Sequence, residues 1–171
     1  MVEVVAAIDS NIFISVINKE PDSTSSKKIL DLIDEGKIRA ILSTIVIAEI
    51  VSGYQEIGDL EEMDEFLSHI LRTASYDVVD VTVSIALEAG NLRAKSGFKL
   101  PDAIIAASAL HRKAEFLISN DDRIRKPSLD KLKVLTAAEF ARTLGNRTER
   151  GQTGVYPHAK PFARDRTNRS F

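Results

Sequence analysis

The stretch Val4-Val5-Ala6-Ala7-Ile8-Asp9-Ser10-Asn11 joins five apolar residues to three polar ones, and it sets the class of fold. A continuous apolar run of this length is typical of a strand that is buried on both faces of a parallel sheet. Residues 11–18 then continue with a helical pattern. A buried strand followed directly by a helix is the repeating unit of α/β proteins.

The same alternation continues through the first 145 residues. Further strands are predicted at 38–42, 77–81, 116–119 and 132–135, and further helices at about 23–35, 44–54, 59–72, 83–96, 101–113 and 136–145. Strands separated by helices favour a parallel sheet with helices on both faces. We therefore predict an α/β fold, a three-layer α/β/α sandwich around about five parallel strands. Ligands bind at the carboxyl edge of such sheets.

Residues 146–171 differ from the body in composition. They are polar, contain Gly, Pro and Arg, show no apolar period, and carry a net charge of about +4, which leaves about −6 on the rest. We expect a single domain at 1–145 and a basic, disordered tail at 146–171. The alternative for the tail is a basic arm that contacts RNA phosphates or a partner.

Composition excludes several classes of protein. The net charge is −2, from 23 Lys+Arg and 25 Asp+Glu, so the chain is not a polycation that holds nucleic acid by bulk charge. The absence of cysteine excludes disulfides, thiolate zinc sites, iron–sulfur clusters and a cysteine nucleophile. No stretch is apolar enough to span a membrane and the N-terminus lacks the pattern of a signal peptide, so we expect a cytoplasmic protein.

Carboxylates remain as the candidates for chemistry. No glycine-rich phosphate loop, nucleophile elbow or His-Glu-x-x-His pattern occurs, and the three histidines lack metal-ligand spacing. Asp9 directly follows the first predicted strand, where its alternative role is that of a helix N-cap. Asp121 follows the strand at 116–119, where its alternative role is an Asx turn, and Asp122 is equally available.

Two further acids lie on predicted helices. Glu49 has the apolar neighbours Val46 and Ile45 three and four positions earlier, so it is either buried at a cost or turned just far enough to reach water. Asp102 follows Pro101 in a first helical turn, where the helix dipole favours an anion whatever the function.

The βα topology allows all four acids to converge on one edge of the sheet. Clustered carboxylates repel one another and need cations between them at neutral pH. With oxygen ligands alone, the fitting metals are Mg²⁺ and Mn²⁺. Such an ion suits phosphodiester hydrolysis, because it activates water and neutralises the phosphoryl oxygens.

At these residues the chain resembles PIN-domain proteins, and most of all the VapC toxin branch of that family. The resemblance covers about residues 2–140. The matching pieces, in the family's order, are Ile8-Asp9-Ser10-Asn11-Ile12-Phe13, Ile47-Ala48-Glu49-Ile50, Leu92-Arg93, Leu100-Pro101-Asp102-Ala103-Ile104-Ile105-Ala106-Ala107-Ser108-Ala109 and Leu117-Ile118-Ser119-Asn120-Asp121.

The resemblance implies roles for individual residues. The family's four acids fall on Asp9, Glu49, Asp102 and Asp121, which would bind the metal and carry catalysis. The family's Ser/Thr-x-Asp pattern places Ser119 and Asp121 in the site and leaves Asp122 in a supporting position. The residues that would hold the acids by hydrogen bonds are Ser10, Asn11 and Ser119.

The resemblance also implies an activity and partners. It implies a Mg²⁺-dependent endoribonuclease with a Rossmann-like sandwich, an RNA substrate, a homodimer, and a cognate antitoxin that lies across the active groove. Because the body is acidic, RNA contacts must come from local basic patches. Candidates are Arg93, Lys95, Lys99 and Arg123, followed by Arg125 and Lys126, and the alternative for all of them is a solvated surface.

The leading hypothesis is therefore a metal-dependent ribonuclease of the toxin type that acts on single-stranded RNA. A PIN-type RNA-processing nuclease without an antitoxin is a second hypothesis. A PIN-like scaffold that binds RNA or protein without cutting is a third.

Overall fold

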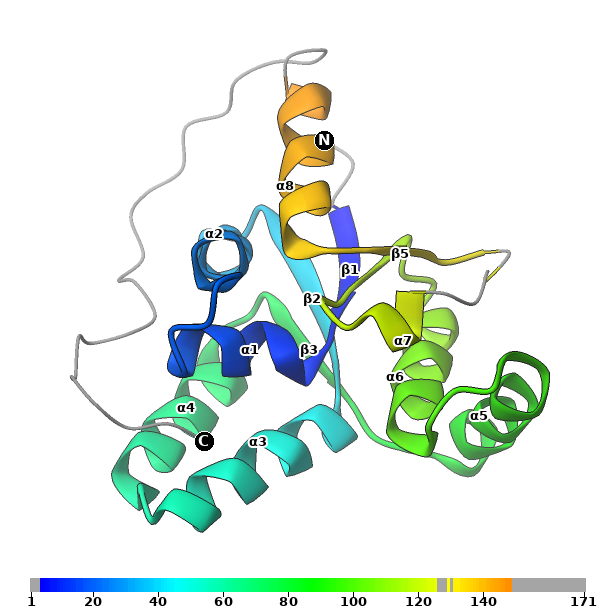
Figure 1. Ribbon diagram of the computed structural model, residues 1–171, viewed down its shortest axis with the longest axis horizontal. Helices are drawn as coiled ribbons and strands as arrows, with labels where there is room; N and C mark the ends of the chain where they lie inside the picture. Colours follow the sequence, from blue (N-terminus) through cyan, green and yellow to red (C-terminus); the bar gives the residue numbers. More distant parts are fainter. Residues whose placement is uncertain (1–3, 126–128, 130, 149–171) are drawn as a thin grey trace.

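The computed structural model describes residues 4–125, 129 and 131–148 (Figure 1). Within that part of the chain, one sheet contains β1 (Val4–Ile8), β2 (Ile38–Ser43), β3 (Tyr76–Val79), β4 (Phe116–Ile118) and β5 (Lys133–Leu135). The strand order is β3-β2-β1-β4-β5, and every neighbouring pair is parallel. The predicted strands are confirmed, with small differences at their ends.

Helices connect the strands in pairs. They are α1 (Ser10–Ile17) and α2 (Ser23–Asp34), α3 (Thr44–Ile57) and α4 (Leu60–Arg72), α5 (Val83–Ser96) and α6 (Leu100–His111), then the short α7 (Asp122–Arg125), and finally α8 (Ala137–Thr148). The helix α7 lies where the sequence indicated only a turn. It is one turn long, which is too short for apolar periodicity to reveal.

The end of α8 differs from its prediction. The sequence predicts that this helix ends at Gly145. Gly97, which ends α5, has a positive φ of +71°, whereas Gly145 does not adopt a positive φ. The helix continues to Thr148 and so crosses the predicted domain boundary at 145. The rest of the predicted tail, 149–171, lies outside the described residues.

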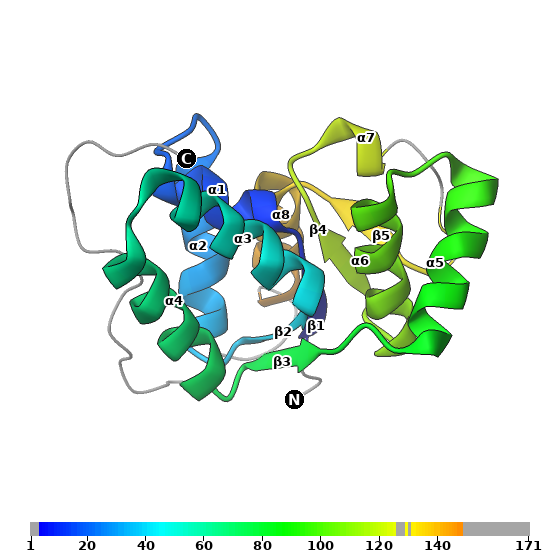
Figure 2. The ribbon, with the colours of Figure 1, turned by 90° about the horizontal axis from the view of Figure 1, so that it is seen from below.

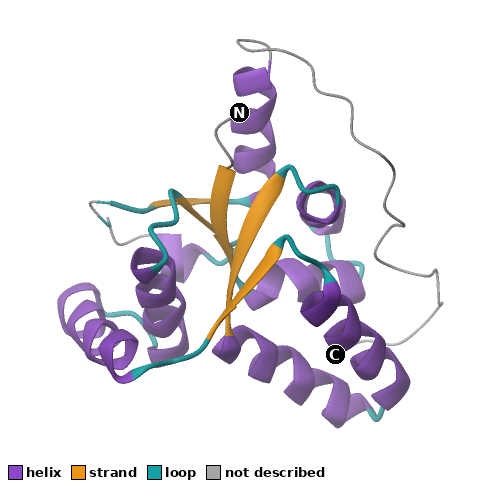
Figure 3. Ribbon diagram, turned by 180° about the vertical axis from the view of Figure 1, so that it is seen from behind, coloured by secondary structure: helices purple, strands orange, loops and turns teal. Residues whose placement is uncertain are grey.

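The helices cover both faces of the sheet. Helix α6 packs on β1, β2 and β4 with α5 outside it, whereas α1, α2, α4 and α8 lie on the opposite side (Figure 2). Figure 3 shows the strands between these two layers of helices. The predicted three-layer α/β/α sandwich is confirmed.

Helix capping agrees in part with the sequence pattern. Thr82 accepts a hydrogen bond from the Ile85 N–H (3.4 Å), and Thr136 and Glu139 cap the start of α8 reciprocally. Ser43 occupies the N-cap position of α3 but its side chain makes no cap hydrogen bond. Its hydroxyl instead accepts a hydrogen bond from Ser108 on α6 (3.1 Å).

The apolar core fixes the carboxyl end of β1. Ala6, Ala7 and Ile8 are at most 2% exposed, because helices cover the strand on both faces. The Asp9 N–H donates to the Ile118 carbonyl oxygen at 3.1 Å, so the ends of β1 and β4 lie side by side. The candidate site is built on this junction. No helix in the described part of the chain is long and apolar enough to cross a membrane.

Candidate active site

Asp9 lies at the centre of a hydrogen-bonded cluster at the carboxyl edge of the sheet. Its side chain is 6% exposed and accepts hydrogen bonds from Ser119 Oγ (2.6 Å), Asn11 Nδ2 (2.8 Å) and Ser10 Oγ (3.3 Å). Three polar side chains from two strand ends therefore fix the orientation of one carboxylate.

The alternative role of Asp9 as a helix cap is not what the structure shows. Asp9 occupies the N-cap position of α1, but its side chain makes no cap hydrogen bond. The carboxylate instead turns to the polar side chains of the cluster. Capping of α1 therefore does not explain why this carboxylate is buried.

The loop after β4 is tied into the same cluster. Asn11 Oδ1 accepts from the Asn120 N–H (3.1 Å), Asn11 Nδ2 donates to Ser119 Oγ (2.9 Å), and Ser119 Oγ accepts from the Asp121 N–H (3.1 Å). Asn11 and Ser119 thus set the path of the backbone that carries Asp121.

Asn120 was not singled out by the sequence. Its side chain donates to Ser26 Oγ on α2 (3.1 Å) and accepts from the Ala137 N–H at the start of α8 (3.1 Å). The sequence signalled only a turn at this position, because the two partners lie far away along the chain.

Burial and neighbouring charges act together on Asp9. Loss of water, together with the negative charges of Glu49 and Asp102, raises its pKa to about 6 against the lowering effect of the hydrogen bond from Ser119. Asp9 therefore ionises at neutral pH only against a penalty that a nearby cation would relieve.

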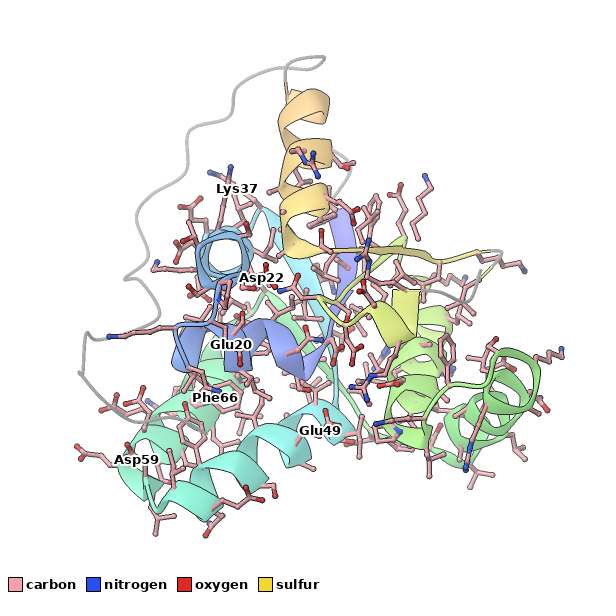
Figure 4. The ribbon with its side chains drawn as sticks, in the orientation of Figure 1. Glu20, Asp22, Lys37, Glu49, Asp59 and Phe66 are labelled. Atoms are coloured by element: carbon pink, nitrogen blue, oxygen red, sulfur yellow. The ribbon has the colours of Figure 1, made fainter. Side chains whose placement is uncertain are left out.

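Glu49 lies in the N-terminal half of α3 (Figure 4). Its side chain is half-buried, and Oε2 is buried without a hydrogen-bond partner. The side chain therefore reaches water in part, as one of the two alternatives requires, but Oε2 does not. A buried carboxylate oxygen without a donor is costly, and a cation would satisfy it.

Asp102 lies in the first turn of α6, directly after Pro101. Burial raises its pKa, and the charge of Asp121 raises it further, while Arg123 and Lys99 act in the opposite direction. The pKa of Asp102 is therefore raised although the residue lies at a helix N-terminus, where an anion is favoured.

Asp121 and Asp122 have different environments. Asp121 Oδ1 accepts from the Arg123 N–H (2.9 Å), which is the Asx turn that the sequence offered as an alternative. The Arg123 side chain also binds this carboxylate and lowers its pKa. Asp122 is 78% exposed and pairs with Arg125 (3.0 Å). Of the two acids, Asp121 is the one coupled to Asp102.

The basic candidates separate into two groups. Lys99 and Arg123 both lower the pKa of Asp102 and Asp121 by their charge. Arg93 and Lys95 are exposed in the last turn of α5, and neither forms a hydrogen bond or ion pair with a described acid of the site. Arg125 is paired with Asp122 and with Glu139 (3.2 Å). Lys126 lies outside the described residues.

Comparison with known proteins identifies the family. Residues 6–128 match the sequence profile of the PIN domain. The chain belongs to the PIN-domain family. No curated protein matches this PIN-domain chain in sequence.

Solved structures share the fold of this PIN domain. VapBC2 from Rickettsia felis, bound to a DNA fragment from its promoter, superimposes with a TM-score of 0.61 at 22% identity, over 78% of this chain and 98% of that one. A toxin–antitoxin complex from Klebsiella pneumoniae gives 0.58 at 22% identity, over 77% and 97%. FitAcB from Neisseria gonorrhoeae gives 0.58 at 16% identity, over 78% and 98%.

The donor chemistry of this PIN domain fits Mg²⁺ or Mn²⁺. The four acids offer only oxygen ligands, and Glu49 Oε2 is a buried oxygen that lacks a partner. The side chains are not gathered, however. Among the described residues, no three His, Asp or Glu side chains are arranged to hold an ion between them. Asp121 is paired with Arg123.

Proposed function

We propose that this PIN domain is a Mg²⁺- or Mn²⁺-dependent endoribonuclease and the toxin of a toxin–antitoxin pair. The observation that carries the proposal is the buried Asp9 carboxylate. Three hydrogen bonds orient it, and its pKa is raised to about 6 by burial and by the charges of Glu49 and Asp102. Accumulated negative charge at the carboxyl edge of a parallel sheet is the setting for a metal-dependent hydrolase.

Each residue has a definite task in this proposal. Ser10, Asn11 and Ser119 hold Asp9 in one orientation, and Asn11 with Ser119 also sets the position of Asp121. The metal ligands would be Asp9, Glu49, Asp102 and Asp121. A divalent ion bound there supplies charge neutralisation and activation of the attacking water.

The RNA backbone would approach from the side of Lys99 and Arg123. Both cations are exposed, and both act on Asp102 and Asp121. In this proposal they would neutralise phosphates next to the scissile bond. Arg93 and Lys95, one helix away, would contact phosphates further along a single strand.

The toxin assignment is supported by the kind of structures that share this fold. Several of them are toxin–antitoxin complexes. We propose that a cognate antitoxin covers the acidic edge of the sheet, that the protein is a homodimer, and that it acts on RNA in the cytoplasm.

The test is cleavage of end-labelled RNAs by the purified full chain in Mg²⁺, Mn²⁺ and EDTA. Asp102→Asn and Asp121→Asn are expected to lower the rate at least ~100-fold, because each removes a charged oxygen from the metal site. Asp122→Asn is the matched control, since its carboxylate is exposed and pairs with Arg125 at 3.0 Å. It should cleave within about threefold of the unchanged protein.

Other outcomes are informative. Cleavage in EDTA, or by folded Asp102→Asn, would contradict the metal-dependent mechanism. Metal-dependent cleavage without growth arrest on expression would favour the RNA-processing nuclease over the toxin. Absence of both cleavage and Mg²⁺ binding would favour the non-catalytic scaffold.

A further inference from the structure

The guanidinium of Arg123 binds the carboxylate of Asp121 through two of its nitrogen atoms. Its Nε lies 3.0 Å from both Oδ1 and Oδ2, and Nη2 also binds Oδ2. The Arg123 N–H donates to Oδ1 as well, at 2.9 Å. Both oxygens of Asp121 are therefore occupied by a side chain only two residues away.

The position of the guanidinium matters beyond this pair. Its own pKa is raised by Asp121 first, and also by the charges of Asp102 and Asp9. Arg123 is therefore a positive charge built into the acid cluster. It supplies part of the charge compensation that the four carboxylates need when they lie together.

A guanidinium and a divalent ion cannot both use the same carboxylate lone pairs. We propose that Arg123 is a tethered counter-cation that occupies Asp121 until a divalent ion displaces it, after which it binds an RNA phosphate. This inference rests on the proposed function and adds a step to it.

The local structure permits this exchange. The Arg123 side chain is 62% exposed, so it can turn without moving the core. Asp121 stays in position when the guanidinium leaves, because its backbone N–H remains bound to Ser119 Oγ and its Oδ1 to the Arg123 N–H. The released guanidinium has the planar fork that suits phosphate oxygens.

The first test is calorimetric titration of the full chain with Mg²⁺ alone. Arg123→Ala and Arg123→Gln are expected to bind Mg²⁺ roughly 3–10-fold more tightly than the unchanged protein, since the competing cation is gone. Arg123→Lys keeps the charge and should stay within about twofold. The matched control is Arg39→Ala, which breaks an exposed Arg–Asp pair with Asp77 (3.1 Å) where β2 begins. It should leave the affinity within about twofold.

The second test is RNA cleavage at saturating Mg²⁺. Arg123→Ala should raise KM on the order of 10-fold while kcat changes less than about threefold, because the phosphate contact is lost and the metal site is intact. A thermal melt of each variant checks that it is folded.

The results separate this inference from the proposed function. Unchanged or weaker Mg²⁺ binding by both Arg123→Ala and Arg123→Gln, with normal binding and cleavage by the unchanged protein, overturns the counter-cation alone. If the unchanged protein neither binds Mg²⁺ nor cleaves RNA, both proposals are overturned. Tighter binding in Arg39→Ala as well would attribute the effect to net charge and also overturn the inference.

Discussion

Asp9 carries its charge in an environment that opposes ionisation. The side chain is buried, and two of the groups that act on it, Glu49 and Asp102, are also acidic. Three hydrogen-bond donors offset part of this cost but leave the pKa at about 6. A residue in such a state reduces stability at neutral pH, which is the pattern of a functional position rather than a structural one.

Asp9→Asn tests the sign of this effect. The folded pKa of Asp9 lies above the ordinary value of an aspartate, 3.8, so the stability that its protonation provides is complete below about pH 4 and is lost as the pH rises through 6. In metal-free buffer the free energy of unfolding of Asp9→Asn should not fall in this way with pH, whereas that of the unchanged protein falls by up to about 3 kcal/mol. Urea unfolding at a series of pH values from 4 to 7.5 measures it.

The control for that series is Asp122→Asn, which changes an exposed carboxylate. It should follow the pH profile of the unchanged protein. An Asp9→Asn profile that runs parallel to that of the unchanged protein would contradict the raised pKa. We expect no cleavage by Asp9→Asn at any pH.

At the scale of elements, the loop between β4 and α7 joins three parts of the molecule. Its Asn120 backbone N–H binds Asn11 at the start of α1, and its side chain joins α2 to the first turn of α8. The loop that carries Asp121 is therefore positioned by helices on one face of the sheet. Packing of α8 and geometry of the site depend on the same residue.

Asn120→Ala should weaken both the packing of α8 and the geometry of the candidate site. Loss of the bonds to Ser26 and to the Ala137 N–H leaves polar groups unsatisfied, at a cost of roughly 1–3 kcal/mol, or about 3–10 °C in Tm. Thermal melts and cleavage rates measure the two effects. Asn91→Ala, on the exposed surface of α5, is the control and should change neither. An unchanged Tm in Asn120→Ala would show that the helices do not depend on this residue.

At the scale of the whole molecule, the acids come from four separate places. Asp9 follows β1, Asp121 follows β4, and Glu49 and Asp102 lie on α3 and α6. Parallel strands bring all their carboxyl ends to one edge, so the fold concentrates negative charge there. A ligand that binds this edge connects elements from both layers of helices.

Divalent metal should therefore stabilise the entire fold. At Mg²⁺ concentrations about 100 times Kd, the gain is about 2.7 kcal/mol, or roughly 5–10 °C in Tm. Differential scanning calorimetry with and without Mg²⁺ measures this shift. Asp102→Asn should lose most of it. An equal shift in that variant would place the stabilising ion elsewhere.

The secondary structure and the four candidate acids could be predicted from the sequence. Apolar runs, helical periodicity and the positions of Gly97 and Pro101 depend on near neighbours, so they could be interpreted from the sequence. Within the part of the chain that the structure describes, this local information located the five strands and every helix except α7. It also named the four candidate acids, whose role as metal ligands stays a prediction.

Other features required the folded chain. Asn120 acquires its role from partners on α2 and α8. Asp121 and Asp122 differ in the exposure of their side chains (25% and 78%) and in the arginine that each one pairs with. The ion pair between Arg123 and Asp121 depends on the Asx turn in which the Arg123 N–H binds Asp121 Oδ1. The physical reason is that periodicity reports which side of an element is buried, whereas hydrogen bonds and ion pairs depend on distances that exist only after the elements have packed.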